Sequence, residues 1–216
     1  MKHILCFGDS NTWGYSPKDG GRYDLARRWP GVLQRELGED FRIIEEGLNG
    51  RTTAWEDPTV DYSRSGMAWL PVCLATHRPL DLVILMLGTN DLKVRFGLTP
   101  WDIASGAARL VKYVGACKEY GPDGVHPPRV LLVSPIHLGA DFASPHHQEG
   151  FGGSDGRRRS LLLAGEYEKR AMELDCRFFD AASAAEPSPL DGIHLDDRGH
   201  HALALALAAQ VREVLL

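Results

Sequence analysis

Three residue types that together support nucleophilic chemistry occur near the two ends of the chain. Acyl transfer through a serine needs a hydroxyl nucleophile, an imidazole that removes its proton, and a group that fixes the imidazole tautomer. Ser10 lies in a Gly-Asp-Ser segment directly after an apolar run. Asp191 precedes His194 by three residues, so one turn would bring its carboxylate to Nδ1 and leave Nε2 for Ser10. The types and spacing favour a Ser10–His194–Asp191 triad.

A tetrahedral intermediate also needs hydrogen-bond donors for its oxyanion. The candidate donors are the Ser10 N–H, the Gly50 N–H in a glycine-containing turn, and the Asn90 side-chain amide. All three follow apolar runs. The sequence therefore predicts an oxyanion hole made by Ser10, Gly50 and Asn90.

Each polar segment also has a purely structural explanation when it is taken alone. Asp and Ser after a strand commonly cap the next helix, and Asp9 is better explained as an acceptor for its own turn. Asn90 and Asp91 could be turn and N-cap residues, and His194 could lie on a surface turn. The occurrence of these segments together, at several strand ends, favours catalysis.

The elements that must position these residues alternate between apolar runs and helical patterns. The runs are continuous and rich in Ile, Val, Leu and Phe, as buried parallel strands are. They cover residues 3–7, 41–45, 82–87, 130–134 and 177–180. Apolar residues at helical spacing follow Thr99-Pro100, recur over 163–174, and form a C-terminal stripe from Ala204 to Leu215. This alternation predicts one α/β domain over 1–216, with ligands at the carboxyl edge of a parallel sheet.

Two segments without a clear pattern, 16–28 and 137–158, are predicted to be inserted loops. Such long loops in a compact domain are commonly rims of sites or interface elements. The basic run Arg157–Arg159 falls in the second segment and is expected to be solvated.

The composition favours an ordinary cytoplasmic enzyme. The chain has 216 residues, 44% hydrophobic residues and a formal net charge of −5, which argues against nucleic-acid and anionic-membrane surfaces. The apolar N-terminal run is too short for a signal peptide, and the longest apolar stretch is too short for a membrane span. Four cysteines without a C-x-x-C spacing are expected to be reduced thiols. The adjacent histidine pairs do not have ligand spacing, so no metal is expected.

The combined segments resemble the SGNH (GDSL-like) hydrolases. Four segments of this chain are similar to the four sequence blocks of that family: G-D-S-N-T at 8–12, the glycine turn at 47–50, G-T-N-D at 88–91 and D-G-I-H at 191–194. The strings at 4–10, 45–53, 73–77 and 86–91 are similar to the bacterial arylesterase/acyltransferase branch. The resemblance implies a flavodoxin-like three-layer α/β/α sandwich with a five-stranded parallel sheet. It also implies Ser10, Asp191 and His194 as triad, Ser10, Gly50 and Asn90 as oxyanion hole, and no cofactor.

The predicted function is a serine esterase for small short-chain acyl esters, aryl or alkyl acetates first, with acyl transfer to alcohols as a second outcome. The alternatives are a carbohydrate O-acetylesterase with the same triad and, in another class, a flavin-binding module. The expected partners are a small-molecule ester and further copies of the chain, with no nucleic acid and no membrane. The predicted substrate pocket contains Asn11, Trp13, Tyr15, Lys93 and Ile193, and Trp55 and Phe96 are further candidates for its rim.

Overall fold

Five parallel strands form one sheet in the order β2-β1-β3-β4-β5. The computed structural model describes residues 1–140 and 145–216. The strands are β1 (Lys2–Gly8), β2 (Phe41–Gly47), β3 (Leu82–Met86), β4 (Arg129–Ser134) and β5 (Arg177–Asp180). All five apolar runs are therefore strands, as predicted. The strand order reverses between β1 and β3, and ligands of open α/β sheets bind beyond the carboxyl ends at such a point.

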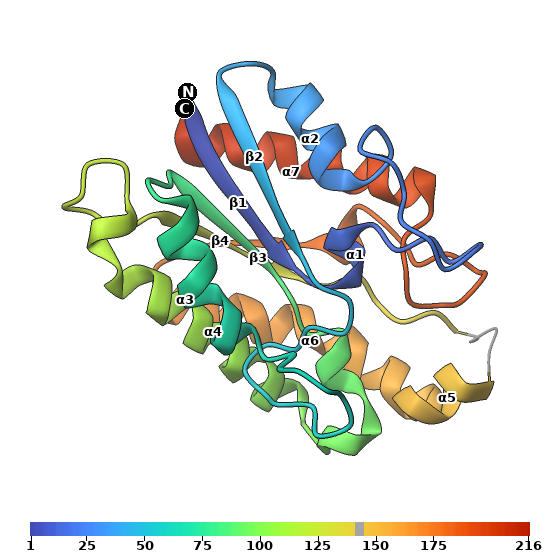
Figure 1. The fold of residues 1–216 in the computed structure, drawn as a ribbon. Coiled ribbons are helices and arrows are strands. Elements are labelled where there is room, and N and C mark those ends of the chain that lie inside the picture. The colour runs from blue at the N-terminus through green and yellow to red at the C-terminus, as the bar shows by residue number, and fades with distance from the viewer. Residues whose placement is uncertain (141–144) are drawn as a thin grey trace.

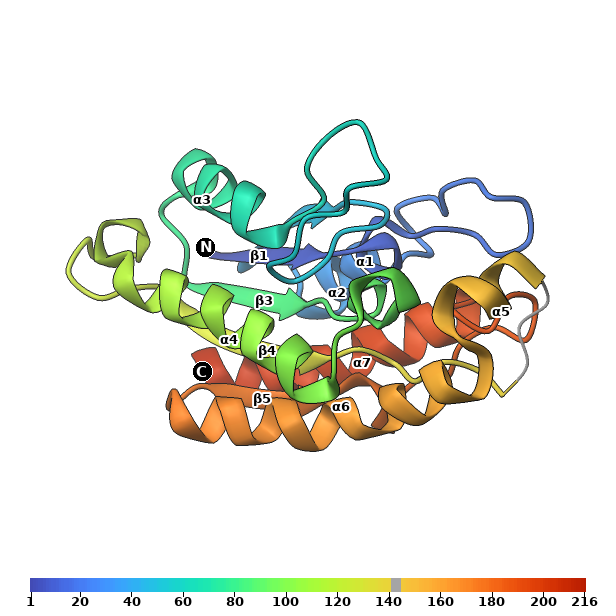
Figure 2. The ribbon, with the colours of Figure 1, turned by 90° about the horizontal axis from the view of Figure 1, so that it is seen from below.

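Helices cover both faces of the sheet and give three layers (Figure 1). One face carries α2 (Trp29–Leu37) and α7 (Asp197–Leu215), and the other carries α3 (Gly66–His77), α4 (Pro100–Ala116) and α6 (Gly153–Glu173). The shorter elements are α1 (Ser10–Trp13), α5 (Pro145–Phe151) and the 3₁₀ turns η1 (Asn90–Leu92), η2 (Val94–Phe96), η3 (Lys118–Tyr120) and η4 (Ala181–Ser183). Figure 2 shows α4 and α6 running along the sheet, with η1, η2 and α5 beyond the carboxyl end of β3.

Alternate side chains of the strands supply two hydrophobic cores. In β1, Leu5 and Phe7 pack with α3, α4 and α6, whereas Ile4 and Cys6 pack with α2 and α7. All four are fully buried. Burying each large apolar side chain stabilises the fold by about 1.5–3 kcal/mol, so burial on both faces explains why these runs are continuously apolar.

The helix signals of the sequence are reproduced in detail. Thr99 and Asp102 form a capping box, in which Asp102 N donates to Thr99 Oγ1 at 3.2 Å and Thr99 N donates to Asp102 Oδ2 at 2.9 Å. The C-terminal stripe is a helix, and Asp196 caps it by accepting from Gly199 N at 2.9 Å.

The two predicted insertions differ in structure. Residues 16–28 contain turns, and Arg22 forms an isolated antiparallel bridge with Tyr15. The prediction of a loop over 137–158 is wrong for its second half, because α5 and the first turns of α6 occupy 145–151 and 153–158. Residues 141–144 of that prediction lie outside the described residues. The glycines at 150, 152 and 153 give this segment a loop-like composition, but packing of α5 against η2 and of α6 against η1 favours helices there.

A buried carboxyl group connects η1 to the segment after β2. Both oxygens of Asp91 accept from Thr53 N at 3.0 Å, and Oδ1 also accepts from Thr53 Oγ1 at 2.5 Å. Burial raises the pKa of Asp91 to about 7, although the hydrogen bonds from Thr53 act in the opposite direction. The contact holds the turn that begins at Asn90.

The raised pKa predicts how an Asp91→Asn variant responds to pH. The unfolded chain has an ordinary carboxyl with a pKa near ~3.9, so between that value and about 7 the folded protein binds more protons. Wild-type stability therefore falls as pH rises through this window, by up to ~1.4 kcal/mol per pH unit from this group, and asparagine removes that loss. We expect the Tm of the variant, relative to wild type, to rise by several degrees from about pH 5 to about pH 8. Thermal unfolding followed by circular dichroism measures this difference. A difference that does not change with pH would contradict the raised pKa.

Candidate active site

Ser10, His194 and Asp191 form a hydrogen-bonded chain at the carboxyl edge of the sheet. Ser10 is the first residue of α1 and is separated from β1 by Asp9 alone, and the other two lie on the loop between η4 and α7. His194 Nε2 lies 2.9 Å from Ser10 Oγ, and Nδ1 lies 2.6 Å from Asp191 Oδ2. A carboxylate accepts the Nδ1 proton, so Nε2 is left as an acceptor toward the serine hydroxyl. This is the geometry that activates a serine.

Asp191 is fixed in its ionised form. Its second oxygen, Oδ1, accepts from the backbone N–H groups of Ile193 and His194, both at 2.9 Å. Burial alone would raise the pKa of Asp191, but the hydrogen bond and charge of His194 outweigh burial and lower it. The carboxylate therefore orients the imidazole and stabilises its protonated form.

The three residues that carry the candidate oxyanion donors all line one cavity. Gly50 has φ +81°, a left-handed conformation that favours glycine, and lies in the turn after β2. Asn90 begins η1, and its Nδ2 donates to Arg51 O at 3.1 Å. An amide nitrogen carries two hydrogens, so a second remains for a substrate oxygen. Ser10, Gly50 and Asn90 thus bring donors from three strand ends to one place.

A buried arginine holds those strand ends together. The Arg51 guanidinium donates to Gly8 O at 2.9 Å and to Glu46 O, and it lies 4.1 Å from the centroid of the Phe7 ring. Burial lowers the pKa of Arg51 to about 10. Because its carbonyl accepts from Asn90, this residue links β1, β2 and η1.

Asn11 connects the nucleophile to the acid–base loop rather than lining the pocket, so its predicted pocket role is wrong. It is buried, its Oδ1 accepts from Leu195 N at 2.9 Å, and its Nδ2 donates to Ile193 O at 3.3 Å. The predicted structural role of Asp9 is confirmed, because Oδ1 accepts from Asn11 N at 3.0 Å. Burial raises the pKa of Asp9.

The cavity above Ser10 has a volume of about 290 Å³. Its lining residues are Ser10, Tyr15, Asn49, Gly50, Asn90, Lys93, Arg95, His147, Gly150, Phe151, Ile193 and His194. Three of the residues predicted for the substrate pocket, Tyr15, Lys93 and Ile193, line this cavity. The Tyr15 ring lies 4.3 Å from the His194 ring, tilted by 37°.

Trp13 does not line this cavity, and neither do Trp55 and Phe96. The Trp13 ring instead packs under the Arg22 guanidinium, whose Cζ lies 5.1 Å from the centroid of the ring. Five further lining residues are not among those predicted from the sequence: Asn49, Arg95, His147, Gly150 and Phe151. Asn49 and Arg95 are close in sequence to predicted residues, which is a signal, whereas the other three belong to a segment interpreted as a loop.

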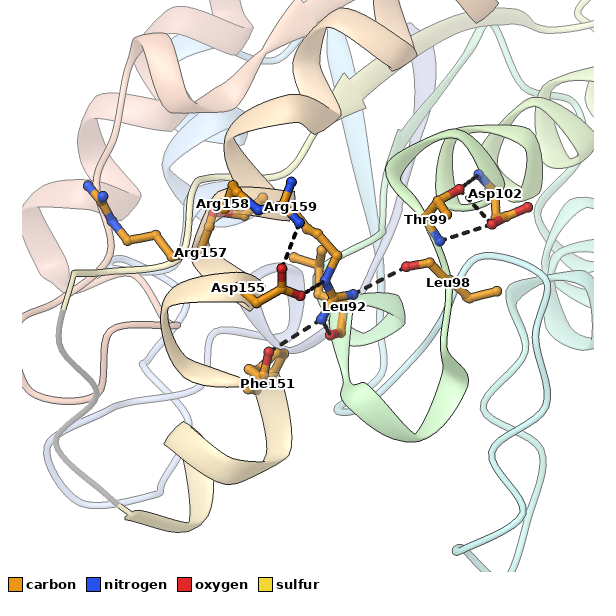
Figure 3. A network of polar contacts seen from close by, with 10 residues as sticks. Leu92, Leu98, Thr99, Asp102, Phe151, Asp155, Arg157, Arg158 and Arg159 are labelled. Carbon is orange, nitrogen blue, oxygen red and sulfur yellow. Dashed lines mark hydrogen bonds and ion pairs between the residues drawn. The ribbon is translucent and has the colours of Figure 1, made fainter.

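Arg159 corrects the prediction of a solvated basic run (Figure 3). It is buried and donates to three carbonyls, those of Leu92 at 2.8 Å, Leu98 at 3.2 Å and Phe151 at 3.4 Å. Its Nε also donates to Asp155 Oδ2 at 3.0 Å. Only Arg157 and Arg158 of the run are exposed. Arg159 therefore fixes one wall of the cavity to η1.

The described residues contain no group of three or more His, Cys, Asp or Glu side chains that could hold a metal ion. Within the same residues, no helix has the length and apolar character needed to cross a membrane.

Comparisons with known proteins agree with this geometry. The native aryl esterase of M. smegmatis is 46% identical, with 100% of both chains covered and a TM-score of 0.93. A carbohydrate acetylesterase family member from Sinorhizobium meliloti is 43% identical, with 100% of this chain and 99% of that chain covered and a TM-score of 0.93. Esterase TesA of Pseudomonas aeruginosa is 34% identical over 71 residues, which are 32% of this chain and only 30% of that curated relative.

A model of the GDSL-like lipase/acylhydrolase family matches residues 6–202, a span that begins within β1 and ends within α7. The match contains all four polar segments that meet at the carboxyl edge of the sheet. The chain belongs to the GDSL-like lipase/acylhydrolase family.

Proposed function

We propose that this carboxylic ester hydrolase acts on small short-chain acyl esters, such as aryl and alkyl acetates, through a covalent acyl-serine. The observation that carries the proposal is the hydrogen-bonded chain from Asp191 through His194 to Ser10. Ser10 and His194 line a cavity that could hold the ester. The similarity to an aryl esterase over the whole chain supports the substrate class.

In the proposed mechanism, Ser10 Oγ attacks the ester carbonyl while His194 Nε2 takes its proton. The Gly50 and Ser10 N–H groups and the Asn90 amide stabilise the oxyanion, and Asp191 stabilises the imidazolium. His194 then gives the proton to the leaving alcohol. Water, activated by the same imidazole, releases the acid from Ser10. No step needs a cofactor.

The size of the cavity supports small substrates. Sites for drug-sized ligands have volumes of roughly 300–1,000 Å³, and this cavity, at about 290 Å³, is at the lower limit. Tyr15, Phe151 and Ile193 give it an apolar part that suits a short acyl chain or an aromatic ring.

A carbohydrate O-acetylesterase is the second candidate, supported by the relative from Sinorhizobium meliloti. The same triad would serve it, so the two functions differ only in the alcohol. Rates with acetylated sugars and with aryl acetates separate them. The flavin-binding alternative is not supported, because family membership and the Ser10–His194–Asp191 geometry both favour an esterase.

We further propose that the chain is one domain, that its copies associate and that it acts in the cytoplasm. Exposed apolar side chains support association, since Trp69, Val72 and Trp101 are 37%, 55% and 55% exposed. All four cysteines are free thiols, as is usual in a reducing compartment.

Removing the proposed nucleophile should abolish turnover. Ser10→Ala deletes one hydroxyl and leaves the fold intact, and we expect kcat for an aryl acetate to fall by at least ~10⁴-fold. Ser105→Ala, on α4 and outside the cavity lining, is the matched control and should retain activity. A Ser10→Ala variant with near wild-type turnover and a native circular-dichroism spectrum would disprove the serine mechanism.

Removing one oxyanion donor should affect kcat more than KM. Asn90→Ala is expected to lower kcat by ~10²–10³-fold, because the amide bond to the substrate oxygen forms mainly in the transition state. Steady-state kinetics with an aryl acetate measure both constants. Thermal unfolding is the control, because the variant also removes the donor to Arg51 O. A loss in kcat below about threefold, far under that range, would make Asn90 a turn residue only.

The apolar part of the cavity also predicts acyl transfer to alcohols. An alcohol competes with water for the acyl-serine only when the site binds it, which is an effective-concentration effect. We expect phenyl acetate and benzyl alcohol in aqueous buffer to yield benzyl acetate beside acetic acid. Chromatography at several alcohol concentrations measures both products. Acetic acid alone at every concentration would show a hydrolase without transferase activity.

A further inference from the structure

Basic side chains line part of the cavity above Ser10. Two of its lining side chains, Lys93 and Arg95, are strong bases, and none of its described lining residues is Asp or Glu. A neutral acetate ester needs no such charge, so this feature is not explained by ester hydrolysis alone.

Lys93 and Arg95 differ in how their charge is balanced. Arg95 forms an ion pair with Asp57, whose Oδ2 lies 2.6 Å from an Arg95 nitrogen. Lys93 is half-buried and has neither an ion pair nor a side-chain hydrogen bond with any described residue. An ammonium group that leaves water without a partner is destabilised.

The charges around Lys93 do not remove this cost. Burial lowers the pKa of the Lys93 ammonium, and the charges of Arg95 and Arg64 lower it further. The opposing carboxylates are Asp57, which is already paired with Arg95, and Asp9, which accepts from Asn11 N and has a pKa raised by burial. Among the described residues, Lys93 therefore has no free carboxylate as a counterion.

The backbone that carries Lys93 is firmly held next to the proposed oxyanion hole. Lys93 lies between η1 and η2, and its N–H donates to Asn90 O at 3.2 Å. The preceding residue, Leu92, is buried, and its carbonyl accepts from Arg159 at 2.8 Å (Figure 3). The ammonium is thus presented from a rigid turn that also carries Asn90.

We propose that Lys93 forms an anion subsite in the active-site cavity and that the preferred substrates are short esters bearing a carboxylate. The ammonium supplies the charge that such a group needs, at a place where Ser10 and Asn90 line the same small volume. A substrate carboxylate would also give Lys93 an ion-pair partner, which it lacks among the described residues. This inference rests on the proposed esterase function and names its substrate class.

Matched pairs of esters test the subsite. In the first pair, 4-acetoxybenzoate carries a carboxylate on its alcohol side that phenyl acetate lacks. In the second pair, monophenyl succinate carries a carboxylate on its acyl side where phenyl butyrate has a methyl group. For each enzyme the readout is the ratio of kcat/KM between the charged and the neutral ester, so a general loss of activity cancels. We expect this ratio to fall about tenfold in Lys93→Met for at least one pair, as the loss of one partly screened ion pair would cause.

Two further variants make the result specific. Lys112→Met, on the exposed side of α4, removes the same charge elsewhere and should leave both ratios at their wild-type values. Lys93→Arg should keep most of the preference. If Lys93→Met does not fold, Lys93→Gln replaces it in the same comparison.

The outcomes separate this inference from the function on which it rests. Equal ratios in wild type and Lys93→Met, with active enzymes, would overturn the anion subsite and leave the esterase standing. An equal fall in Lys93→Met and Lys112→Met would assign the preference to net charge and also overturn the subsite. A wild-type enzyme inactive on all four esters would overturn the proposed function itself.

Discussion

The candidate site depends on a single buried guanidinium, that of Arg51. Parallel strands place their carboxyl ends at one edge of a sheet, but the turns that follow them have no regular hydrogen bonds to each other. Arg51 supplies those bonds, because it binds the carbonyls at the ends of β1 and β2 and offers its own carbonyl to Asn90. The direct contacts of this guanidinium are carbonyl oxygens and the face of the Phe7 ring.

Two other polar contacts extend this support to the remaining parts of the site. Asn11 joins the nucleophile turn to the loop that carries His194, through bonds to the backbone on both sides of that residue. Arg159 joins α6 to the carbonyls of Leu92 and Phe151. In each case one side chain binds the backbone of a distant segment. Fixed backbone positions of this kind are what an oxyanion hole and a serine–imidazole pair need, because their donors must be in place before charge develops.

The sequence predicted what depends on local pattern. The strands follow from apolar runs buried on both faces, and the start of α4 follows from the Thr99 cap. The hydrogen-bonded arrangement of Ser10, His194 and Asp191 follows from the strings around Ser10 and His194. It failed where the role of a residue depends on a distant partner. Asn11 was interpreted as a pocket residue because it follows the nucleophile, yet its partners are more than 180 positions away. Arg159 was interpreted as solvated because its neighbours are charged, but the burial of a helical residue depends on which face packs.

The turn that begins at Asn90 joins catalysis to the recognition of the substrate. Asp91 anchors it to Thr53, Arg159 holds Leu92, and Asn90 and Lys93 both face the cavity. The buried side chains of Asp91 and Arg159 thus hold the backbone of the turn from which both the Asn90 amide and the Lys93 ammonium project. A group bound by Lys93 would therefore lie in the same cavity as the oxyanion donors, within the reach of one lysine side chain from this turn. This coupling favours short substrates, because a longer acyl or alcohol part would place its charge beyond the reach of the turn.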